Sequence, residues 1–200
     1  MPLKFLYMKH LIVIAFLCCF YTAKAQSVIS LEQAATYKGD SLFPATVNYV
    51  KDINHKLDPF IGIWKGSNAG WLYEVRFTKK TAWDFGLPGD GIKWDLLIGR
   101  VLVKDSLTNQ VLYNTLDSTD DKTHFSGDNF GTPRVYNMYF GANSECYDWG
   151  DVAIVMHPTD TTKMTMFFDR NVEWVDPSTC PGGYANYKTM LPARMGLTKQ

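Results

Sequence analysis

The chain has no excess of charge of either sign, because 20 lysine and arginine residues are balanced by 20 aspartate and glutamate residues. No run of basic residues interrupts this balance. A nucleic-acid-binding domain usually shows a basic patch or stripe, and adhesion to an anionic membrane surface usually needs a polybasic segment. The composition therefore predicts a protein without a nucleic-acid partner.

Motifs for catalysis and for cofactor binding are also absent from the sequence. It has no Gly-x-Ser-x-Gly elbow, no phosphate-binding loop and no dinucleotide fingerprint. Outside the first 25 residues the histidines are His55, His124 and His157, and none of them forms the close pair that often marks a zinc site. We therefore predict no catalytic residue, no metal site and no cofactor.

Long hydrophobic runs are scarce. The longest, Leu11–Phe20, is about half of the roughly 20 residues that a membrane-spanning helix needs. Lys4 and Lys9 precede it, and Ala23-Lys24-Ala25 follows it. This layout is typical of a secretory signal peptide, here cleaved before Gln26. We expect a secreted or periplasmic protein with no stable membrane span after cleavage.

Cysteine is rare once the expected signal peptide, residues 1–25, is set aside. Only Cys146 and Cys180 remain, 34 residues apart. An even pair in an exported chain is most simply a disulfide, whereas a redox pair would more often show Cys-x-x-Cys spacing. The 175 residues of 26–200 suit one domain with a single core.

Hydrophobic periodicity indicates β-structure after a short helical start. A helix is expected at residues 30–36 with Ser30 as its cap, and the spacing of Tyr49, Ile53 and Leu57 predicts a second short helix. After Pro59 the period is two, and short segments separated by turn residues follow one another at intervals of about 8–12 residues. The pattern predicts an all-β antiparallel sandwich or barrel of about eight to ten strands.

A resemblance narrows this choice. Residues 57–66 contain Gly62-Ile63-Trp64 after a short helical turn. This segment resembles the opening of lipocalins and related calycins, in which Gly-x-Trp begins an up-and-down barrel and the tryptophan plugs its closed end. The resemblance implies a lipocalin-like (calycin-type) up-and-down barrel over residues 26–200, with structural roles for Gly62 and Trp64.

A second resemblance covers most of the chain after the leader. Residues 49–54 through Gly66, Thr78-Lys79-Lys80 and the closing residues 197–200 are similar to a family of uncharacterised secreted bacterial proteins that carry a domain of unknown function. That family is assigned no reaction. The resemblance therefore implies a fold and export, and it supplies no catalytic residues.

Two rows of apolar side chains are the candidate ligand-binding residues. Each row shares one face of an expected strand because side chains alternate along a strand. Flat rings and flexible thioethers that line one lumen could adapt to an apolar guest. We therefore expect a non-enzymatic protein that binds a small hydrophobic or amphipathic ligand. The six residues are Trp71, Tyr73, Phe77, Met164, Met166 and Phe168.

Two other functions stay open. Glu145, Asp148 and Asp151 lie close together in the sequence, and paired carboxylates are what a glycosidase uses, so a secreted hydrolase is one alternative. A filled barrel with exposed aromatic residues around Trp149 and Trp174 would instead favour an envelope interaction protein. The sequence gives no indication of oligomeric state.

Overall fold

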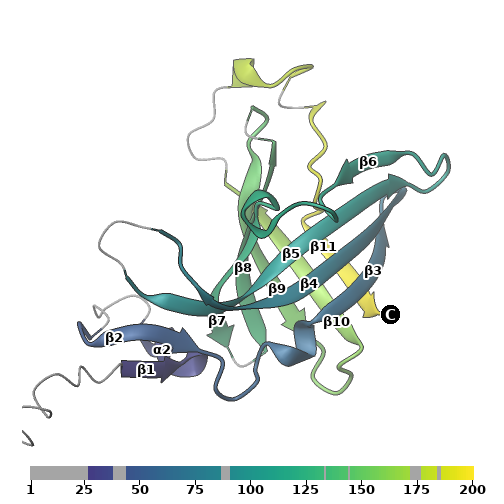
Figure 1. Ribbon diagram of the computed structural model, residues 1–200. Helices are drawn as coiled ribbons and strands as arrows, with labels where there is room; N and C mark the ends of the chain where they lie inside the picture. Colours follow the sequence, from purple (N-terminus) through teal and green to yellow (C-terminus); the bar gives the residue numbers. More distant parts are fainter. Residues whose placement is uncertain are drawn as a thin grey trace, which may run out of the picture.

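The computed structural model describes residues 27–37, 44–86, 91–132, 134–143, 145–171, 177–183 and 186–200 (Figure 1). The expected signal peptide, its cleavage site and Trp174 lie outside these residues. In chain order the elements are β1 (Ser27–Ser30), α2 (Leu31–Thr36), β2 (Val47–Lys51), η1 (Asp58–Phe60), β3 (Gly62–Asn68), β4 (Trp71–Trp83), β5 (Lys93–Asp105), β6 (Val111–Asn114), η2 (Asp120–Lys122), β7 (Phe125–Thr132), β8 (Val135–Asn143), β9 (Asp148–Met156), β10 (Lys163–Arg170), η3 (Pro177–Thr179) and β11 (Arg194–Lys199).

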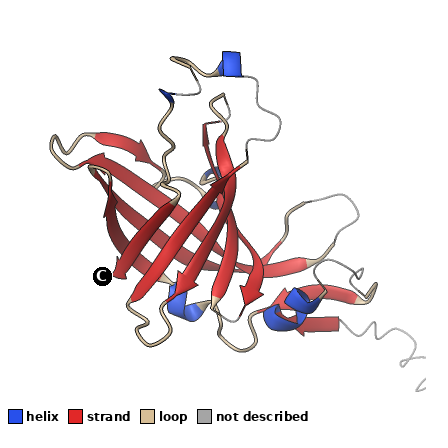
Figure 2. Ribbon diagram, turned by 180° about the vertical axis from the view of Figure 1, so that it is seen from behind, coloured by secondary structure: helices blue, strands red, loops and turns tan. Residues whose placement is uncertain are grey.

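Eight antiparallel strands close into a barrel (Figures 1 and 2). From β3 to β5 and from β7 to β11, each strand pairs with the next one in the chain. The circuit closes where β5 pairs with β7 and where β11 returns to β3. β6 pairs with β5 outside this circuit. The predicted all-β antiparallel barrel with a short helix near its start is confirmed.

Alternating burial along the strands separates the interior from the outer face. In β4, Tyr73, Val75 and Phe77 are buried, whereas Leu72 is 44% exposed on the opposite face. Met164, Met166 and Phe168 of β10 are buried in the same way. Side chains at every second position of a strand share a face, so both rows of candidate residues belong to one hydrophobic core.

Phenylalanine rings pack against one another across the barrel interior. The Phe77 ring centroid lies 5.6 Å from that of Phe125, and Phe125 lies 5.4 Å from Phe140. Phe140 in turn lies 5.8 Å from Phe168, so edge-to-face contacts run from β4 to β10. Each such pair contributes about 0.5–1.5 kcal/mol beyond its area burial. Gly99 on β5 makes the space, since a Cβ there would lie 2.4 Å from Phe125 Cδ1.

Trp64 lies fully buried near one end of the barrel. Its indole Nε1–H donates to the Phe60 carbonyl of η1 at 2.7 Å. Lys199 of the last strand places its Nζ 5.3 Å from the Trp64 ring centroid and donates to the Pro59 carbonyl at 3.0 Å. The Trp64 ring and the Lys199 ammonium group thus connect β3 and β11, the first and last strands of the barrel, at this end.

Close approach of β3 and β11 depends on Gly66 more than on Gly62. A Cβ on Gly66 would lie 2.5 Å from the backbone oxygen of Gly196, which cannot move away as a side chain can. At Gly62 the nearest atom is the flexible Lys199 Cε at 3.0 Å, but its φ of +130° is a conformation that other residues rarely adopt. Both glycines therefore support closure, for different reasons.

The N-terminal strands β1 and β2 extend the sheet beside the barrel, continuing from β5 (Figure 1). Ser30 caps α2 by accepting from the Gln33 N–H at 3.1 Å, as expected. The second expected helix is wrong: β2 occupies Val47–Lys51 and pairs in parallel with β1 and β5. Ile53 is 50% exposed, so the fourfold spacing does not mark one buried face.

A buried carboxylate organises the chain after β2. Asp52 accepts from the Lys56 and Leu57 N–H groups and from Lys79 Nζ at 2.6 Å. These bonds shape a turn that leads into η1 and tie it to β4. No helix in the described part of the chain is long and apolar enough to cross a membrane.

Candidate ligand-binding site at the barrel mouth

A cleft of about 510 Å³ opens at the end of the barrel opposite Trp64. Strand register defines this end, which we call the mouth: Trp71 pairs with Asp105 there, whereas Phe77 pairs with Gly62 at the Trp64 end. The walls of the cleft come from β6, the end of β8, the following turn and the segment before β11. They are Leu112, Tyr113, Ala142, Asn143, Glu145, Tyr187 and Met190.

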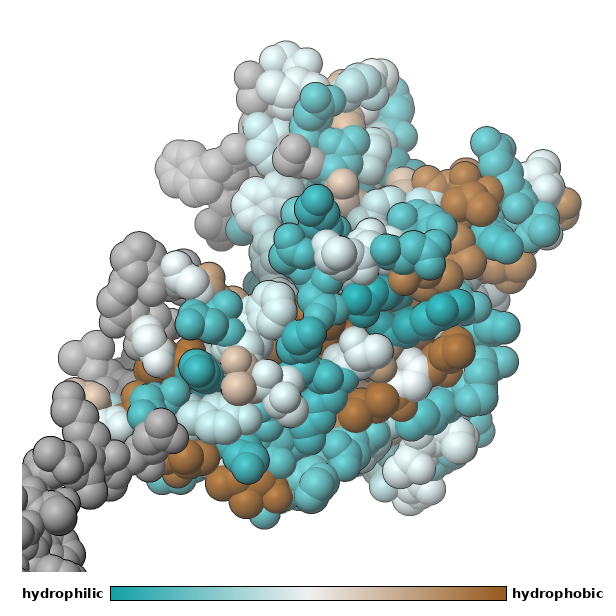
Figure 3. Space-filling model, viewed as in Figure 1, coloured by the Kyte–Doolittle hydropathy of each residue, from teal (hydrophilic) through white to brown (hydrophobic). Residues whose placement is uncertain are grey.

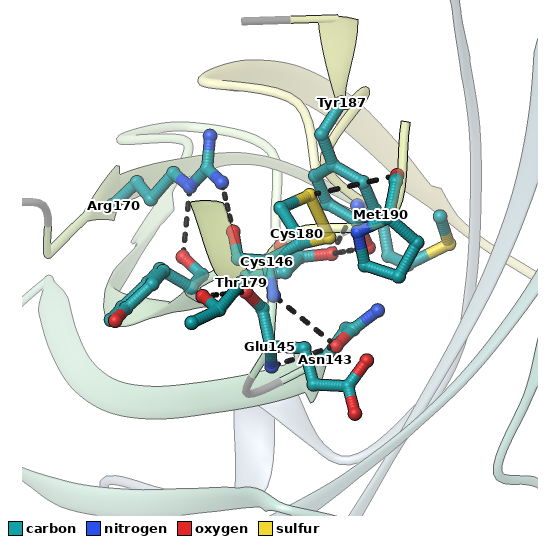
Figure 4. Close-up of a disulfide and its surroundings, with 11 residues drawn as sticks. Asn143, Glu145, Cys146, Arg170, Thr179, Cys180, Tyr187 and Met190 are labelled. Atoms are coloured by element: carbon teal, nitrogen blue, oxygen red, sulfur yellow. Dashed lines mark hydrogen bonds between the residues drawn. A yellow bond between two sulfur atoms is a disulfide. The ribbon is translucent and has the colours of Figure 1, made fainter. Parts of the chain in front are cut away.

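The predicted disulfide is confirmed and holds one wall of this cleft (Figure 4). The Cα atoms of Cys146 and Cys180 are 4.5 Å apart, and both residues are buried. Thr179 Oγ1 donates to the Glu145 carbonyl at 3.0 Å beside it. The bridge therefore fastens the segment before β11 to the turn between β8 and β9.

Arg170 strengthens the same junction from the end of β10. Its Nε–H donates to the Tyr147 carbonyl at 2.8 Å, and its Nη2 donates to the Cys146 carbonyl (Figure 4). The guanidinium also lies 5.6 Å from the Tyr187 ring centroid. Charge-assisted hydrogen bonds of this kind hold a turn more firmly than neutral ones.

Asp148 is the polar centre of the mouth. It is fully buried on the inner face of β9. Its Oδ2 accepts from the Met190 N–H at 2.8 Å and from the Tyr187 hydroxyl at 3.0 Å. Burial raises the pKa of Asp148, and these two hydrogen bonds and the charge of Arg170 oppose the rise without cancelling it. Its Oδ1 has no hydrogen-bond partner among the described residues.

The charge of Asp148 acts on three tyrosines. Burial, and then the charge of Asp148, raise the pKa values of Tyr73 and Tyr113 to about 12. The same two causes raise the pKa of Tyr187. Tyr187 bonds directly to Asp148, and Tyr113 and Tyr187 line the cleft, so the mouth combines one carboxylate with aromatic rings.

The six candidate ligand-binding residues are spread along the barrel. Trp71 is partly buried at the mouth with Tyr73 beside it, their ring centroids 6.5 Å apart. Phe168 reaches this level through Phe140, whose ring lies 6.0 Å from Tyr113. Phe77, Met164 and Met166 lie deeper, since Phe77 pairs with Gly62 and Met164 with Leu197. The structure therefore brings Trp71, Tyr73 and Phe168 nearest to the cleft.

Sequence reasoning missed three residues of this site. Tyr113 lies on the four-residue strand β6, and Tyr187 and Met190 lie in a segment without regular structure. No periodic pattern marks residues of this kind. Only the position of Cys180, a few residues before Tyr187, offered a signal, because a disulfide brings its neighbours to the turn at Cys146.

The three acidic residues considered for hydrolysis are not presented together. Asp148 faces the interior, whereas Asp151, three residues further along β9, is exposed on the outer face. Glu145 is exposed in the preceding turn. Within the described residues, no group of three or more His, Cys, Asp and Glu side chains could hold a metal ion.

Comparison with known proteins places the chain in a family. The model described as "Family of unknown function (DUF6705)" matches residues 8–168, so the chain belongs to this family. No curated protein and no solved structure gives a match.

Proposed function

We propose that this member of the DUF6705 family is an exported, non-enzymatic, lipocalin-like protein that binds a small hydrophobic or amphipathic ligand at the mouth of its barrel. The cleft beside Asp148 carries this proposal, because it joins aromatic and apolar walls to a few polar groups. Ligand sites commonly combine these features. Small ligands also bind in the mouths of other β-barrels.

The packing below the cleft supports a site at the mouth. The contacts from Phe77 through Phe125 and Phe140 to Phe168 run through the interior, from the Trp64 end toward the mouth. A ligand would therefore lie above these rings, against Trp71, Tyr73 and Tyr113. The rim is apolar as well: Figure 3 shows hydrophobic surface over the hairpin of β5 and β6, where Leu107, Val111 and Leu112 are exposed.

Lipocalin-like identity and export have separate support. Gly62-Ile63-Trp64 begins the first strand of the barrel, and Trp64 is buried at the end opposite the cleft. A disulfide is typical of an oxidising compartment, as is the leader pattern of residues 1–25. Intact-mass analysis of the exported protein should find Gln26 at its N-terminus. Material that retains residues 1–25 would contradict the cleavage.

A neutral fluorescent probe tests ligand binding at the mouth. Leu112 lines the cleft and is 36% exposed, so Leu112→Glu should leave the fold intact. It should weaken binding of N-phenyl-1-naphthylamine by about tenfold, because the probe would desolvate the new carboxylate. Titration of probe fluorescence measures the affinity, and native mass spectrometry of the purified protein checks for a ligand retained from the cell.

Leu107→Glu is the matched control. Leu107 lies on the same hairpin, is 94% exposed and does not line the cleft. Its affinity for the probe should stay within about twofold of the original protein, since no burial changes. Equal weakening by both variants, or no binding by the original protein, would overturn the proposal.

The outer aromatic surface supports a second candidate, an envelope interaction protein. Tyr139 and Trp149 lie 6.2 Å apart between ring centroids, and Tyr139 is 41% exposed. They line a depression of about 400 Å³ together with His124. Exposed aromatic residues of this kind fit a protein or glycan contact. This candidate takes precedence if the neutral probe does not bind.

A further inference from the structure

The carboxylate of Asp148 has an acceptor that none of the described residues satisfies. Both hydrogen bonds to the side chain reach Oδ2, from Met190 and Tyr187, and Oδ1 has no partner among the residues described. Asp148 is fully buried, so bulk water does not reach the group freely. An unsatisfied buried acceptor costs about 1–3 kcal/mol, and more when it is charged. Such a group at a candidate ligand site points to a missing partner.

We propose that Asp148 Oδ1 binds the ammonium group of a small apolar amine whose hydrocarbon part lies in the mouth cleft. This inference rests on the proposed function and names its ligand class. Tyr187 and Met190 both contact Asp148 and line the cleft, so the cleft and the carboxylate share a wall. A ligand in the cleft would therefore contact two residues that are bonded to Asp148, and rearrangement of the flexible Met190 side chain would bring its ammonium group to Oδ1.

The hydrogen-bond pattern favours a donor over an acceptor on the ligand. Oδ2 receives two donors, as an ionised carboxylate can, and an ionised Oδ1 can only accept a third. A ligand carboxylate would place negative charge against negative charge. An ammonium group instead supplies donors and a charge that makes the hydrogen bond stronger.

Other groups of the cleft also favour a cationic ligand. Tyr113 and Tyr187 line the cleft, and ring faces attract cations. Glu145 adds a negative charge on the cleft wall. Of the protein cations near the mouth, Arg170 is bonded to two carbonyls, and Lys188 lies 3.5 Å from the Trp71 ring centroid.

Three probes that differ only in their polar group test the inference on the unmodified protein. They are 2-phenylethylamine, 2-phenylethanol and phenylacetate, titrated by calorimetry at neutral pH. We expect the amine to bind at least about tenfold more tightly than the alcohol, because only it forms a charge-assisted bond. Phenylacetate should bind most weakly. Equal affinity of the amine and the alcohol, or preference for phenylacetate, would overturn the amine inference.

Matched variants locate the effect. Asp148→Asn removes the charge and keeps an acceptor for Tyr187 and Met190, so it should lower amine affinity by about tenfold and change alcohol affinity by less than about twofold. Asp151→Asn, on the outer face of the same strand, should change neither. Equal loss of amine affinity in both variants would contradict the assignment to Asp148.

The two proposals fail in different ways. If N-phenyl-1-naphthylamine binds at the mouth and the amine shows no preference over the alcohol, the amine inference is overturned and the proposed function stands. If the amine and the alcohol do not bind at all while the neutral probe does, the inference is likewise overturned. If the neutral probe also fails to bind, the proposed function fails with it.

Discussion

Asp148 connects stability with the candidate site at the scale of a single residue. A carboxylate that is buried without full hydrogen bonding destabilises the unliganded protein, and burial raises its pKa accordingly. The folded protein therefore holds this proton at pH values where the unfolded chain has released it. By proton linkage, the contribution of Asp148 to stability falls as pH rises from the ordinary value of 3.8 through the raised folded value.

Replacing Asp148 with asparagine should remove this pH dependence. Asp148→Asn does not ionise, so its stability relative to the original protein should rise as pH increases across that interval and should level off above it. Urea unfolding at a series of pH values measures the difference. Asp151→Asn, on the outer face of the same strand, is the matched control. A relative stability of Asp148→Asn that falls with rising pH would contradict the buried, raised carboxyl.

At the same scale, the sequence indicated some residues and concealed others. Two cysteines follow the expected signal peptide, and they have one possible intramolecular pairing, so the disulfide could be predicted. The sequence did not show that Asp148 already lies on β9, so it did not show that Asp148 and Asp151 face opposite sides of one strand. Residues three apart on a strand face opposite sides. Tyr187 and Met190 reach the site through tertiary contacts, which leave no local pattern.

At the scale of elements, the disulfide should stabilise both the fold and the mouth. It closes a 34-residue separation, for which chain entropy predicts a loss of about 3.5–4 kcal/mol in the Cys146→Ser/Cys180→Ser double variant. The variant should also bind the neutral probe more weakly, because Tyr187 and Met190 follow Cys180 and lose this attachment.

Urea unfolding and probe titration of the double variant measure the two effects. The original protein under a reducing agent serves as the control and should show the same losses. A decrease in the free energy of unfolding below about 1 kcal/mol would show that Arg170 and Thr179 alone hold the junction.

The sequence predicted strands correctly where one face of the strand is buried. It failed where hydrogen bonds to buried polar groups determine the local structure. Burial along β4 alternates with period two from Tyr73 to Phe77, and the spacing of apolar residues in the sequence predicted this alternation. The spacing of Tyr49, Ile53 and Leu57 suggested a helix, but Tyr49 donates through its hydroxyl to Asp95 at 2.5 Å and lies on a strand beside β5. Asp52 then binds the N–H groups of a turn, which competes with helix formation.

At the scale of the whole molecule, the strand count and meander order followed from the spacing of turns, but the closure did not. Consecutive strands pair with each other, so local turns largely specify the barrel. The two seams that close it, β5 with β7 and β3 with β11, depend on room for a neighbouring backbone or ring to approach closely. Gly66 lets β11 approach, and Gly99 admits the Phe125 ring. Neither glycine stands out from the other glycines in the sequence.

The seam between β5 and β7 should be the place where the barrel opens first. Only Ile98 and Ser126 form a register pair across it within the described residues, whereas β8 and β9 share eight pairs. Because so few residues pair across this seam, packing of Phe125 against Gly99 and Phe77 is expected to stabilise it. Local opening follows the least protected junction, so amides of β7 should exchange faster than those of β9.

Phe125→Leu tests this dependence on ring packing. The smaller side chain leaves a gap at the seam, so amide exchange in β7 should accelerate by about tenfold or more while the protein stays folded. Hydrogen exchange followed by mass spectrometry compares peptides from β7 with those from β9 and β10. Exchange that accelerates equally in all strands would mean that the barrel opens only by global unfolding, and the seam would then have no separate role. Acceleration confined to β7 would show that the barrel opens first at the seam between β5 and β7.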